Sequence, residues 1–256
     1  MNISKPLIVT LFTIILACQS KELSVENPLM FFLPKVTDNA HLVTHTAYLV
    51  EYSPKVKDPI WVAYYLTGNE VKAKGRRHGE FRPDPAVQGG TASLEDYKYS
   101  GYDRGHQAPA ADFKWNPQAE DETFFLSNIC PQNSGMNRGI WEHLENHVRY
   151  WAEHFGKIYV VTGPLLDTCI ARIGRDRVCV PRGFFKVILD CSDRRNYQAI
   201  AFIMRNTNLP ETDPIQKYSC KVDSVEKITG IRFFATFPNS EERRVDTTLI
   251  LSHWQF

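Results

Sequence analysis

The chain has 256 residues, of which 43% are hydrophobic and 23% charged, and its formal net charge is +1. These values exclude a disordered or collagen-like chain and indicate a globular protein of one large or two small domains with a sizeable core. They also exclude a globally cationic body, so a nucleic-acid ligand would need a local basic groove.

Residues 1–18 have the pattern of an export signal. Lys5 precedes an apolar run over 7–17 that is too short to span a bilayer, and Cys18 follows it. This ending resembles a bacterial lipoprotein signal, in which the cysteine is acylated and becomes the first residue. We expect an exported protein of the cell envelope or periplasm, held to the membrane by a lipid on Cys18. Plain cleavage and secretion is the alternative, because Leu16 stands where a small residue is commoner.

The next stretch, 19–40, contains prolines and charged residues without a sustained period, and it predicts a tether. Phe31, Phe32 and Leu33 within the tether are expected to dock on the folded domain. We place that domain at 41–256, since no internal repeat or low-complexity segment divides it.

Cysteine usage agrees with export. Apart from Cys18 the chain has five cysteines, an odd number, so at least one is expected to stay unpaired. A disulfide between Cys169 and Cys179 would stiffen the arginine-rich segment between them. A pair between Cys191 and Cys220 is the second expectation. Cys130 is interpreted as a small buried side chain.

Short runs rich in β-branched and aromatic residues predict the strands of a central sheet. Ser53-Pro54 and Asp58-Pro59 are expected to turn the chain between the first two strands. Apolar residues at helical spacing predict a long helix over 137–155 that stops at Gly156, and a short helix is expected over 222–228. The predicted strands cover 44–52, 60–67, 122–126, 158–162, 184–189 and 198–204.

Two basic segments lie between predicted strands. Such a run is most often a solvated loop, but beside an active cleft it would contact phosphates and steer the substrate. The disulfide expected in the second segment favours a groove there. The first segment holds Lys72, Lys74, Arg76, Arg77 and Arg82, and the second Arg172, Arg175, Arg177 and Arg182.

The richest chemistry lies within residues 102–113, which contain Asp103-Arg104-Gly105-His106. Histidine changes charge nearest neutral pH, so it can take a proton while a neighbouring guanidinium holds an anion. This pairing suits phosphate-ester chemistry. The alternative is a turn in which Arg104 pairs with Asp103 around a structural histidine, because a four-residue match is weak evidence alone.

Further blocks follow at fixed spacing. Residues 126–132 read Leu-Ser-Asn-Ile-Cys-Pro-Gln, residues 137–145 read Asn-Arg-Gly-Ile-Trp-Glu-His-Leu-Glu, and Arg149 comes one helical turn later. Together these blocks resemble the DNA/RNA non-specific endonucleases, the endonuclease G-like ββα-metal family, from Ala47 to Phe237. The resemblance implies an α+β fold with a mixed, largely antiparallel sheet flanked by helices. It also implies a metal-dependent endonuclease that cuts DNA and RNA without strong sequence preference and leaves 5′-phosphate ends.

The resemblance assigns the base and the metal site. His106 would deprotonate the attacking water. Asn137 would be the direct protein ligand of a single Mg²⁺, for which Mn²⁺ could substitute, and waters would fill the remaining coordination. Glu145 would hold metal-bound water without touching the ion. Taken alone, Asn137 would be read as a helix cap and Glu145 as a surface partner of Arg149.

The resemblance also assigns residues to the substrate. Arg104 and Arg149 would bind the scissile phosphate and stabilise its added charge. Asn128 would help to orient the site. Arg138 follows the metal asparagine where a glutamine is common in the family, so it is expected to contact the substrate and to affect its preference.

Two other functions are weighed against this one. His143 and His147 are four apart on the predicted helix, as in a zinc hydrolase, but the zinc-protease pattern has its glutamate directly after the first histidine, whereas Glu145 comes two residues later. An inactive nucleic-acid-binding surface module would keep the fold and lose the chemistry. The presence of every chemical group in the blocks argues against such decay.

Overall fold

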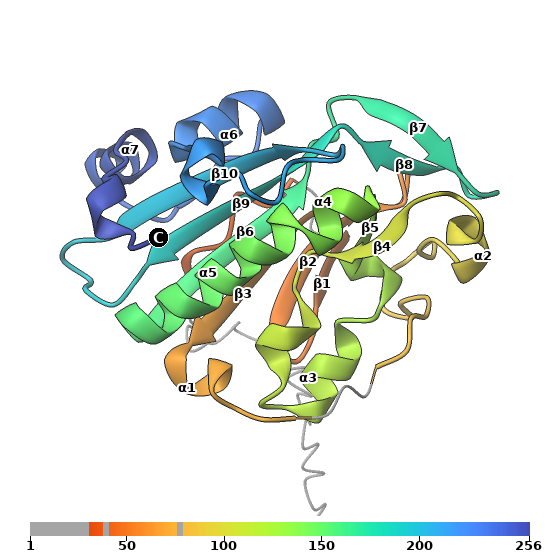
Figure 1. The fold of residues 1–256 in the computed structure, drawn as a ribbon, viewed down its shortest axis with the longest axis horizontal. Coiled ribbons are helices and arrows are strands. Elements are labelled where there is room, and N and C mark those ends of the chain that lie inside the picture. The colour runs from red at the N-terminus through yellow and green to blue at the C-terminus, as the bar shows by residue number, and fades with distance from the viewer. Residues whose placement is uncertain (1–30, 38–40, 76–78) are drawn as a thin grey trace, which may run out of the picture.

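The computed structural model describes residues 31–37, 41–75 and 79–256 (Figure 1). The expected signal peptide with Cys18, most of the expected tether, and Arg76 and Arg77 lie outside these residues. No helix in the described part of the chain is long and apolar enough to cross a membrane.

The centre of the fold is a seven-stranded sheet whose neighbouring strands are antiparallel, in the order β1-β2-β3-β6-β9-β10-β11. This confirms the predicted α+β class. The strands are β1 (Leu42–Thr44), β2 (Tyr48–Ser53), β3 (Asp58–Thr67), β6 (Lys157–Pro164), β9 (Gly183–Asp190), β10 (Gln198–Arg205) and β11 (Ser219–Cys220).

Both faces of the sheet are covered by helices (Figure 1). Alternate residues of a strand point to opposite faces, so β3 contributes Val62 and Tyr64 to one hydrophobic core and Trp61 and Ala63 to the other. The long helix α5 (Ile140–Phe155) packs its buried side chains on the first face. The second face is covered by α6 (Val222–Thr229) and α7 (Asn239–Thr247).

The ββα unit stands at one end of the first face. Strands β4 (Asp103–His106) and β5 (Ile129–Gln132) pair antiparallel, with Gly105 opposite Cys130. Gly105 is required there, because a Cβ atom would lie 2.0 Å from the Gln132 side chain. The predicted second strand over 122–126 is wrong in position.

Residues 122–126 instead contain the end of a helix and the chain that follows it. Asn116 caps α3 (Pro117–Glu122) by accepting from two backbone N–H groups, and Pro117 occupies its first turn. The chain then passes through the 3₁₀ turn η4 (Leu126–Asn128) into β5. Phe124 and Leu126 are buried and Phe125 is partly exposed, and the run pairs with Arg82 through an isolated parallel bridge and not through a strand.

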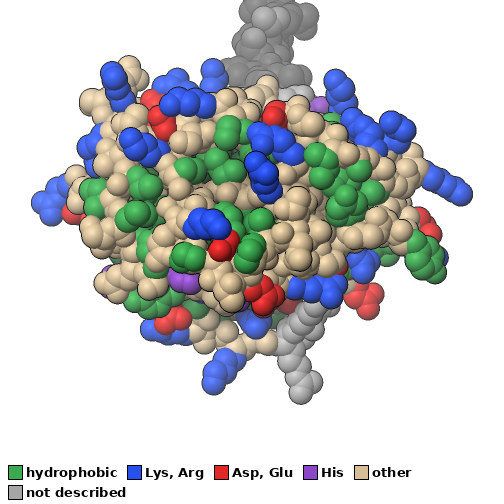
Figure 2. Space-filling view, turned by 45° about the horizontal axis from the view of Figure 1, so that its top comes forward, with side chains coloured by type: hydrophobic (Ala, Val, Ile, Leu, Met, Phe, Trp, Pro, Cys, Tyr) green, Lys and Arg blue, Asp and Glu red, His purple; other side chains and the backbone are tan. Residues whose placement is uncertain are grey.

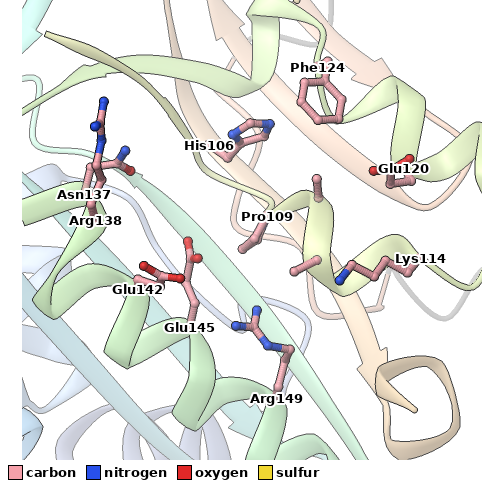
Figure 3. A pocket seen from close by; sticks show the side chains of 12 residues that line it. His106, Pro109, Lys114, Glu120, Phe124, Asn137, Arg138, Glu142, Glu145 and Arg149 are labelled. Atoms are coloured by element: carbon pink, nitrogen blue, oxygen red, sulfur yellow. The ribbon is translucent and has the colours of Figure 1, made fainter. Parts of the chain in front are cut away.

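The single helix predicted over 137–155 is two helices. Asn133 caps α4 (Ser134–Arg138), and α5 begins at Ile140. Gly139 separates them with φ −111° and ψ −112°, and a Cβ atom there would lie 2.6 Å from the Gly135 carbonyl oxygen. The break turns the two helices so that both present side chains to the same pocket (Figure 3).

Two turns near the start of the domain also differ from prediction. The strand predicted over 44–52 is broken by the turn of the β1–β2 hairpin, in which Glu122 accepts from the Thr46 backbone and hydroxyl at 2.7 and 2.9 Å. Asp58-Pro59 begins β3, because the chain already turns at Ser53, which accepts from Val56 and Lys57. The remaining short elements are α1 (Gly68–Val71), α2 (Leu94–Tyr97), η3 (Ala110–Phe113), η5 (Ile215–Tyr218) and η6 (Leu251–His253).

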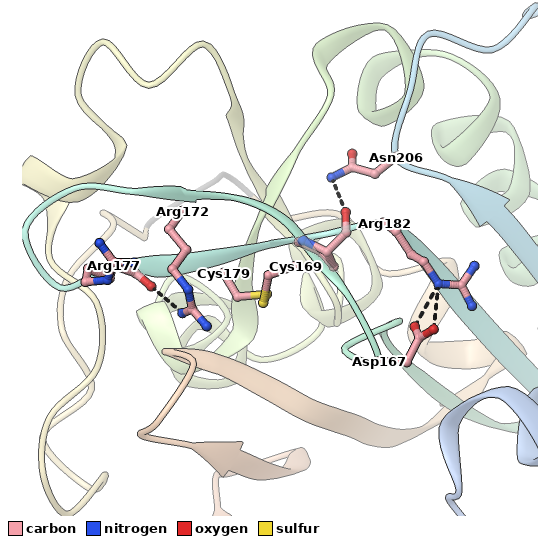
Figure 4. The surroundings of a disulfide bond; sticks show 8 residues. Asp167, Cys169, Arg172, Arg177, Cys179, Arg182 and Asn206 are labelled. Carbon is pink, nitrogen blue, oxygen red and sulfur yellow. Dashed lines mark hydrogen bonds and ion pairs between the residues drawn. A yellow bond between two sulfur atoms is a disulfide. The ribbon is translucent and has the colours of Figure 1, made fainter.

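The second arginine segment is a hairpin, not a loop. Strands β7 (Cys169–Ile173) and β8 (Val178–Pro181) pair, and the predicted disulfide joins Cys169 to Cys179 (Figure 4). The expected pair between Cys191 and Cys220 is wrong, because both thiols are free in this structure.

Two remaining predictions on side-chain burial are confirmed. Cys130 is a free, fully buried thiol. Phe32 and Leu33 are buried on the second face of the sheet, where the Phe32 ring lies 5.5 Å from that of Tyr159 and 5.6 Å from that of Phe237. Phe31 is half exposed. The segment before residue 41 therefore adds to the hydrophobic core.

Candidate active site

A pocket of about 410 Å³ opens between β4, η3 and the helices α3, α4 and α5 (Figure 3). Four of the residues predicted to act together, His106, Asn137, Glu145 and Arg149, line it. Arg138 lines it as well. The other lining residues include Lys114, Glu120, Phe124 and Glu142.

His106 stands at the end of β4 with its ring held between aromatic side chains. The ring centroids of Phe81 and Phe124 lie 5.3 and 5.0 Å from that of the imidazole. The residue is partly buried, and its strand is fixed by pairing with β5. This packing limits the ring to a small range of orientations toward the pocket.

Asp103 fixes the side chains of α4. It accepts a 3.0 Å hydrogen bond from the Asn137 amide, a 2.9 Å bond from Ser134, and bonds of 2.8 and 2.7 Å from Arg138. Burial alone would raise the pKa of Asp103, but these donors outweigh burial and hold its pKa below the ordinary value. The alternative in which Arg104 pairs with Asp103 is wrong, because Arg138 forms that ion pair.

Glu145 lies on the α5 face that looks into the pocket (Figure 3). Burial raises the pKa of its carboxyl to about 7, although the positive charge of Lys186 opposes this. Asp112 raises the pKa further and Arg149 lowers it. Glu142 lines the pocket one turn earlier on the same helix. The site thus holds a carboxyl group that titrates near neutral pH.

Arg149 points into the pocket from α5, with 18% of its side chain exposed. It donates to Asp112 at 2.9 Å and to Asn146 at 2.7 Å. Asp112 is fully buried and accepts a second bond, at 2.9 Å, from the Tyr64 hydroxyl. The ion pair that helical spacing permits between Glu145 and Arg149 is thus replaced by one with Asp112.

The other two predicted site residues lie outside the pocket. Arg104 is exposed and lines a neighbouring hollow, where its guanidinium carbon lies 4.5 Å from the Phe81 ring centroid. Asn128 is fully buried: its side chain accepts from the Ala108 N–H at 2.8 Å and donates to the carbonyls of Ala108 and Thr123. It therefore holds the segment that follows His106 and does not face the solvent.

Basic side chains are common on one face of the molecule. On the face drawn in Figure 2, Lys and Arg side chains are spread widely and are more frequent than Asp and Glu. Two of the basic residues in the predicted runs are already paired: Arg82 with Asp121, and Arg182 with Asp167 (Figure 4). Lys72, Lys74 and Arg172 are exposed.

The histidines of the zinc alternative lie in a different place. His143 and His147 line a separate hollow with Asp213. The Asp213 carboxylate already accepts hydrogen bonds from Lys217 and Tyr218. Among the residues described, no group of three His, Cys, Asp or Glu side chains is arranged to hold a metal ion. The arrangement gives no support to a zinc hydrolase.

Three residues at or near the site, Asp112, Glu142 and Lys186, are not predicted from the sequence. Glu142 could have been found, because it is three residues before Glu145 on one helix face. Asp112 belongs to the motif segment, but its partner Arg149 comes from a different element. Lys186 is a fully buried lysine on β9, 4.9 Å from the Trp141 ring, and a strand sequence does not show what covers it.

The chain is similar to known nucleases over most of its length. Residues 29–240 match the DNA/RNA non-specific endonuclease family. Human mitochondrial endonuclease G is 32% identical over 206 residues, which are 76% of this chain and 69% of that protein. Zebrafish (Danio rerio) mitochondrial nuclease EXOG is 37% identical over 204 residues, 74% of this chain and 60% of that protein.

A fungal relative and a solved structure add to this. Nuclease C1 of Cunninghamella echinulata is 35% identical over 202 residues, 73% of this chain and 80% of that protein. A chain in the crystal structure of the EndoG/EndoGI complex has a TM-score of 0.73 and 32% identity, covering 77% of this chain and 87% of that one. The chain therefore belongs to the DNA/RNA non-specific endonuclease family and is a non-specific nuclease, a phosphodiester hydrolase.

Proposed function

We propose that the chain cuts DNA and RNA with Mg²⁺ as its cofactor and leaves 5′-phosphate and 3′-hydroxyl ends. The observation that carries this proposal is the meeting of His106, Asn137, Glu145 and Arg149 in one pocket. Water attacks phosphorus, the bond from phosphorus to the 3′ oxygen breaks, and the released oxygen takes a proton from solvent. The pocket holds a base, oxygen donors and a cation for these steps.

The donor set fits a hydrated magnesium ion. The Asn137 amide nitrogen is engaged with Asp103, so its oxygen is free to face the pocket, where the carboxylates of Glu142 and Glu145 also stand. Mg²⁺ prefers oxygen donors and keeps several waters, so it does not need a protein cage of many ligands. Asn137 would hold the ion directly and Glu145 through its waters. When bound, the ion neutralises charge that builds up on the phosphate.

The remaining steps belong to side chains of this chain. The His106 imidazole takes the proton of the attacking water. Arg149, oriented by Asp112, binds the scissile phosphate and stabilises its added charge. Arg138 lies at the rim with 73% of its side chain exposed, where it can contact a neighbouring phosphate.

The test is cleavage of plasmid DNA and of RNA by purified protein, with Mg²⁺ or Mn²⁺ and with EDTA. We expect both nucleic acids to be cut when metal is present, neither in EDTA, and 5′-phosphate ends on the products. Binding without cleavage in every condition would instead support the alternative of an inactive nucleic-acid-binding module.

We further propose that the protein is exported and held in the cell envelope by a lipid on Cys18. The support is the pattern of residues 1–18, in which a basic residue and a short apolar run precede the cysteine. Cys18→Ser is expected to release the protein from the detergent phase, because acyl chains supply the membrane affinity. A wild-type protein that is soluble, with an unmodified amino terminus beyond Cys18, would exclude the anchor.

A further inference from the structure

A second hollow, of about 350 Å³, adjoins the strand that carries His106. It lies between β4 and the end of α2, and Arg104 of the motif lines it. The other lining residues are Leu94, Glu95, Tyr97, Lys98, Tyr102 and Asp103. The Arg104 side chain is therefore directed into this hollow and not into the active pocket.

Phe81 connects the hollow to the active pocket. Its ring lies 4.5 Å from the Arg104 guanidinium carbon and 5.3 Å from the centroid of the His106 imidazole. Arg104 and His106 are two residues apart on β4, so they face the same side of the strand, about 6.6 Å from each other along it. That separation is close to the spacing of neighbouring phosphates in an extended nucleic-acid strand.

An exposed aromatic side chain stands beside Lys98, one of the residues that line the hollow: the Lys98 Nζ atom lies 5.7 Å from the ring centroid of Tyr99. Tyr99 is 95% exposed and has a positive φ of 57°, an uncommon conformation for a large side chain. The turn around it is well fixed. The Ser100 hydroxyl donates to the Tyr97 carbonyl at 2.8 Å and accepts from the Tyr102 N–H at 3.2 Å. Tyr99 is thus held outward on a rigid turn.

Within the described part of the chain, the positive charge of Arg104 is left without a partner carboxylate, so the hollow can accept an anion. Asp103 is neutralised by Arg138, and Glu95 lies 3.6 Å from Lys98 in a highly exposed, weak pair. Among the ion pairs of residues 31–37, 41–75 and 79–256, none involves Arg104. Its guanidinium is stacked on Phe81 with its donors available to a phosphate.

We propose that this hollow binds the nucleotide next to the scissile phosphate on a single strand of the substrate. Arg104 and Lys98 contact its phosphate, and its base stacks on Tyr99 and Tyr102. Cationic grooves with aromatic platforms bind single strands without regard to sequence, because every base has a stacking face. The proposal rests on the proposed function and extends it, since it names the contact that favours single-stranded DNA and RNA.

The test compares Tyr99→Ala with Tyr99→Phe, and with Tyr150→Ala as the matched control. Tyr150, on α5, is another exposed tyrosine, and its hydroxyl donates to the Gln255 side chain. The affinity of each variant for an oligothymidylate of about 20 nucleotides is measured by fluorescence anisotropy in EDTA. Hydrolysis of the small diester bis(p-nitrophenyl) phosphate is measured with Mg²⁺, and affinity for duplex DNA serves as a second comparison.

Tyr99→Ala is expected to weaken single-strand binding at least about fivefold, whereas Tyr99→Phe and Tyr150→Ala bind like the wild type. Binding of duplex DNA and hydrolysis of the small diester stay unchanged in all three. Unchanged single-strand affinity in Tyr99→Ala, or an equal loss for duplex DNA or the small diester, would overturn the proposal. A wild type that binds the oligonucleotide through Tyr99 but hydrolyses nothing would contradict the proposed function alone.

Discussion

Arg149 of α5 and Asp112 of η3 form a 2.9 Å ion pair beneath the active pocket, and the Asp112 carboxylate is fully buried. Two elements distant in sequence thereby fix the direction of the cation proposed to hold the phosphate. Burial alone would lower the pKa of Arg149, but Asp112 outweighs burial and raises it, so the guanidinium stays charged.

Asp112→Asn tests this relationship. The amide keeps the shape of the side chain and loses its charge, so Arg149 is expected to lose its fixed orientation. The kcat/KM for cleavage is then expected to fall at least about tenfold. Asp167→Asn is the matched control, because it breaks an Arg–Asp pair with Arg182 that is more than one third exposed. That change is expected to leave activity unaltered and to alter stability by less than about 1 kcal/mol. Equal effects of the two substitutions would remove the role given to Asp112.

The ionisation of Glu145 predicts a dependence of stability on pH. Its pKa rises from 4.5 to about 7 on folding, mainly through burial, so the folded protein holds an extra proton between these values. Stability therefore falls as pH rises through this interval, and the loss is complete above about pH 7. In EDTA, Glu145→Gln is expected to have a higher Tm than the wild type near pH 8 and a similar Tm near pH 4. Glu142→Gln, at the exposed rim, is the control.

The same Tm difference at both pH values would contradict this account. Such a result would mean that Glu145→Gln acts through packing and not through the titration of the carboxyl group.

Lys186 is predicted to set the pH at which Glu145 ionises. Its ammonium group is fully buried, 4.9 Å from the Trp141 ring, and its charge lowers the pKa of Glu145. Lys186→Met keeps an apolar side chain of similar length, so the fold is expected to survive. The pH at which activity falls on the acid side should move upward. A profile that is unmoved or moves downward would show that Lys186 does not act on Glu145.

The disulfide is predicted to stabilise the β7–β8 hairpin. It joins residues with a sequence separation of 10, and closing a loop of this length is worth about 3 kcal/mol. Reduction, or Cys169→Ser with Cys179→Ser, is therefore expected to lower the Tm. Non-reducing peptide mapping should find Cys169 linked to Cys179 and the thiols of Cys130, Cys191 and Cys220 alkylated after unfolding. Any linkage that includes Cys130 would contradict the structure.

The local pattern was enough to predict most strands and the core face of α5, whereas the residues that line the pocket were expected from the resemblance to the nuclease family. The local pattern failed where tertiary packing decides the conformation. The apolar run at 124–126 has the composition of a strand, yet it connects α3, which Asn116 caps, to the 3₁₀ turn η4 and buries Phe124 and Leu126. The break at Gly139 could not be predicted, because it depends on the close approach of the Gly135 carbonyl and of the Glu211 side chain, which is distant in sequence.

In the site, too, some residues could be expected from the sequence and others depend on tertiary packing. His106, Asn137 and Glu145 stand in recognisable blocks of sequence, and the fold brings them together. Arg104 stands in the same block as His106, but the strand directs it to the adjoining hollow over Phe81. Asp112 could not be assigned, because its function depends on the approach of α5 to η3, which no local pattern encodes.

The central claim is that His106 is the base of a metal-dependent nuclease, and the most direct test is the cleavage rate of His106→Ala on plasmid DNA at saturating Mg²⁺. The substitution removes the proton acceptor and leaves Asn137 and Arg149 in place. The account predicts unchanged DNA and Mg²⁺ binding, with cleavage at least ~10²-fold slower than in the wild type. Near-normal cleavage by His106→Ala would contradict it and place the chemistry elsewhere.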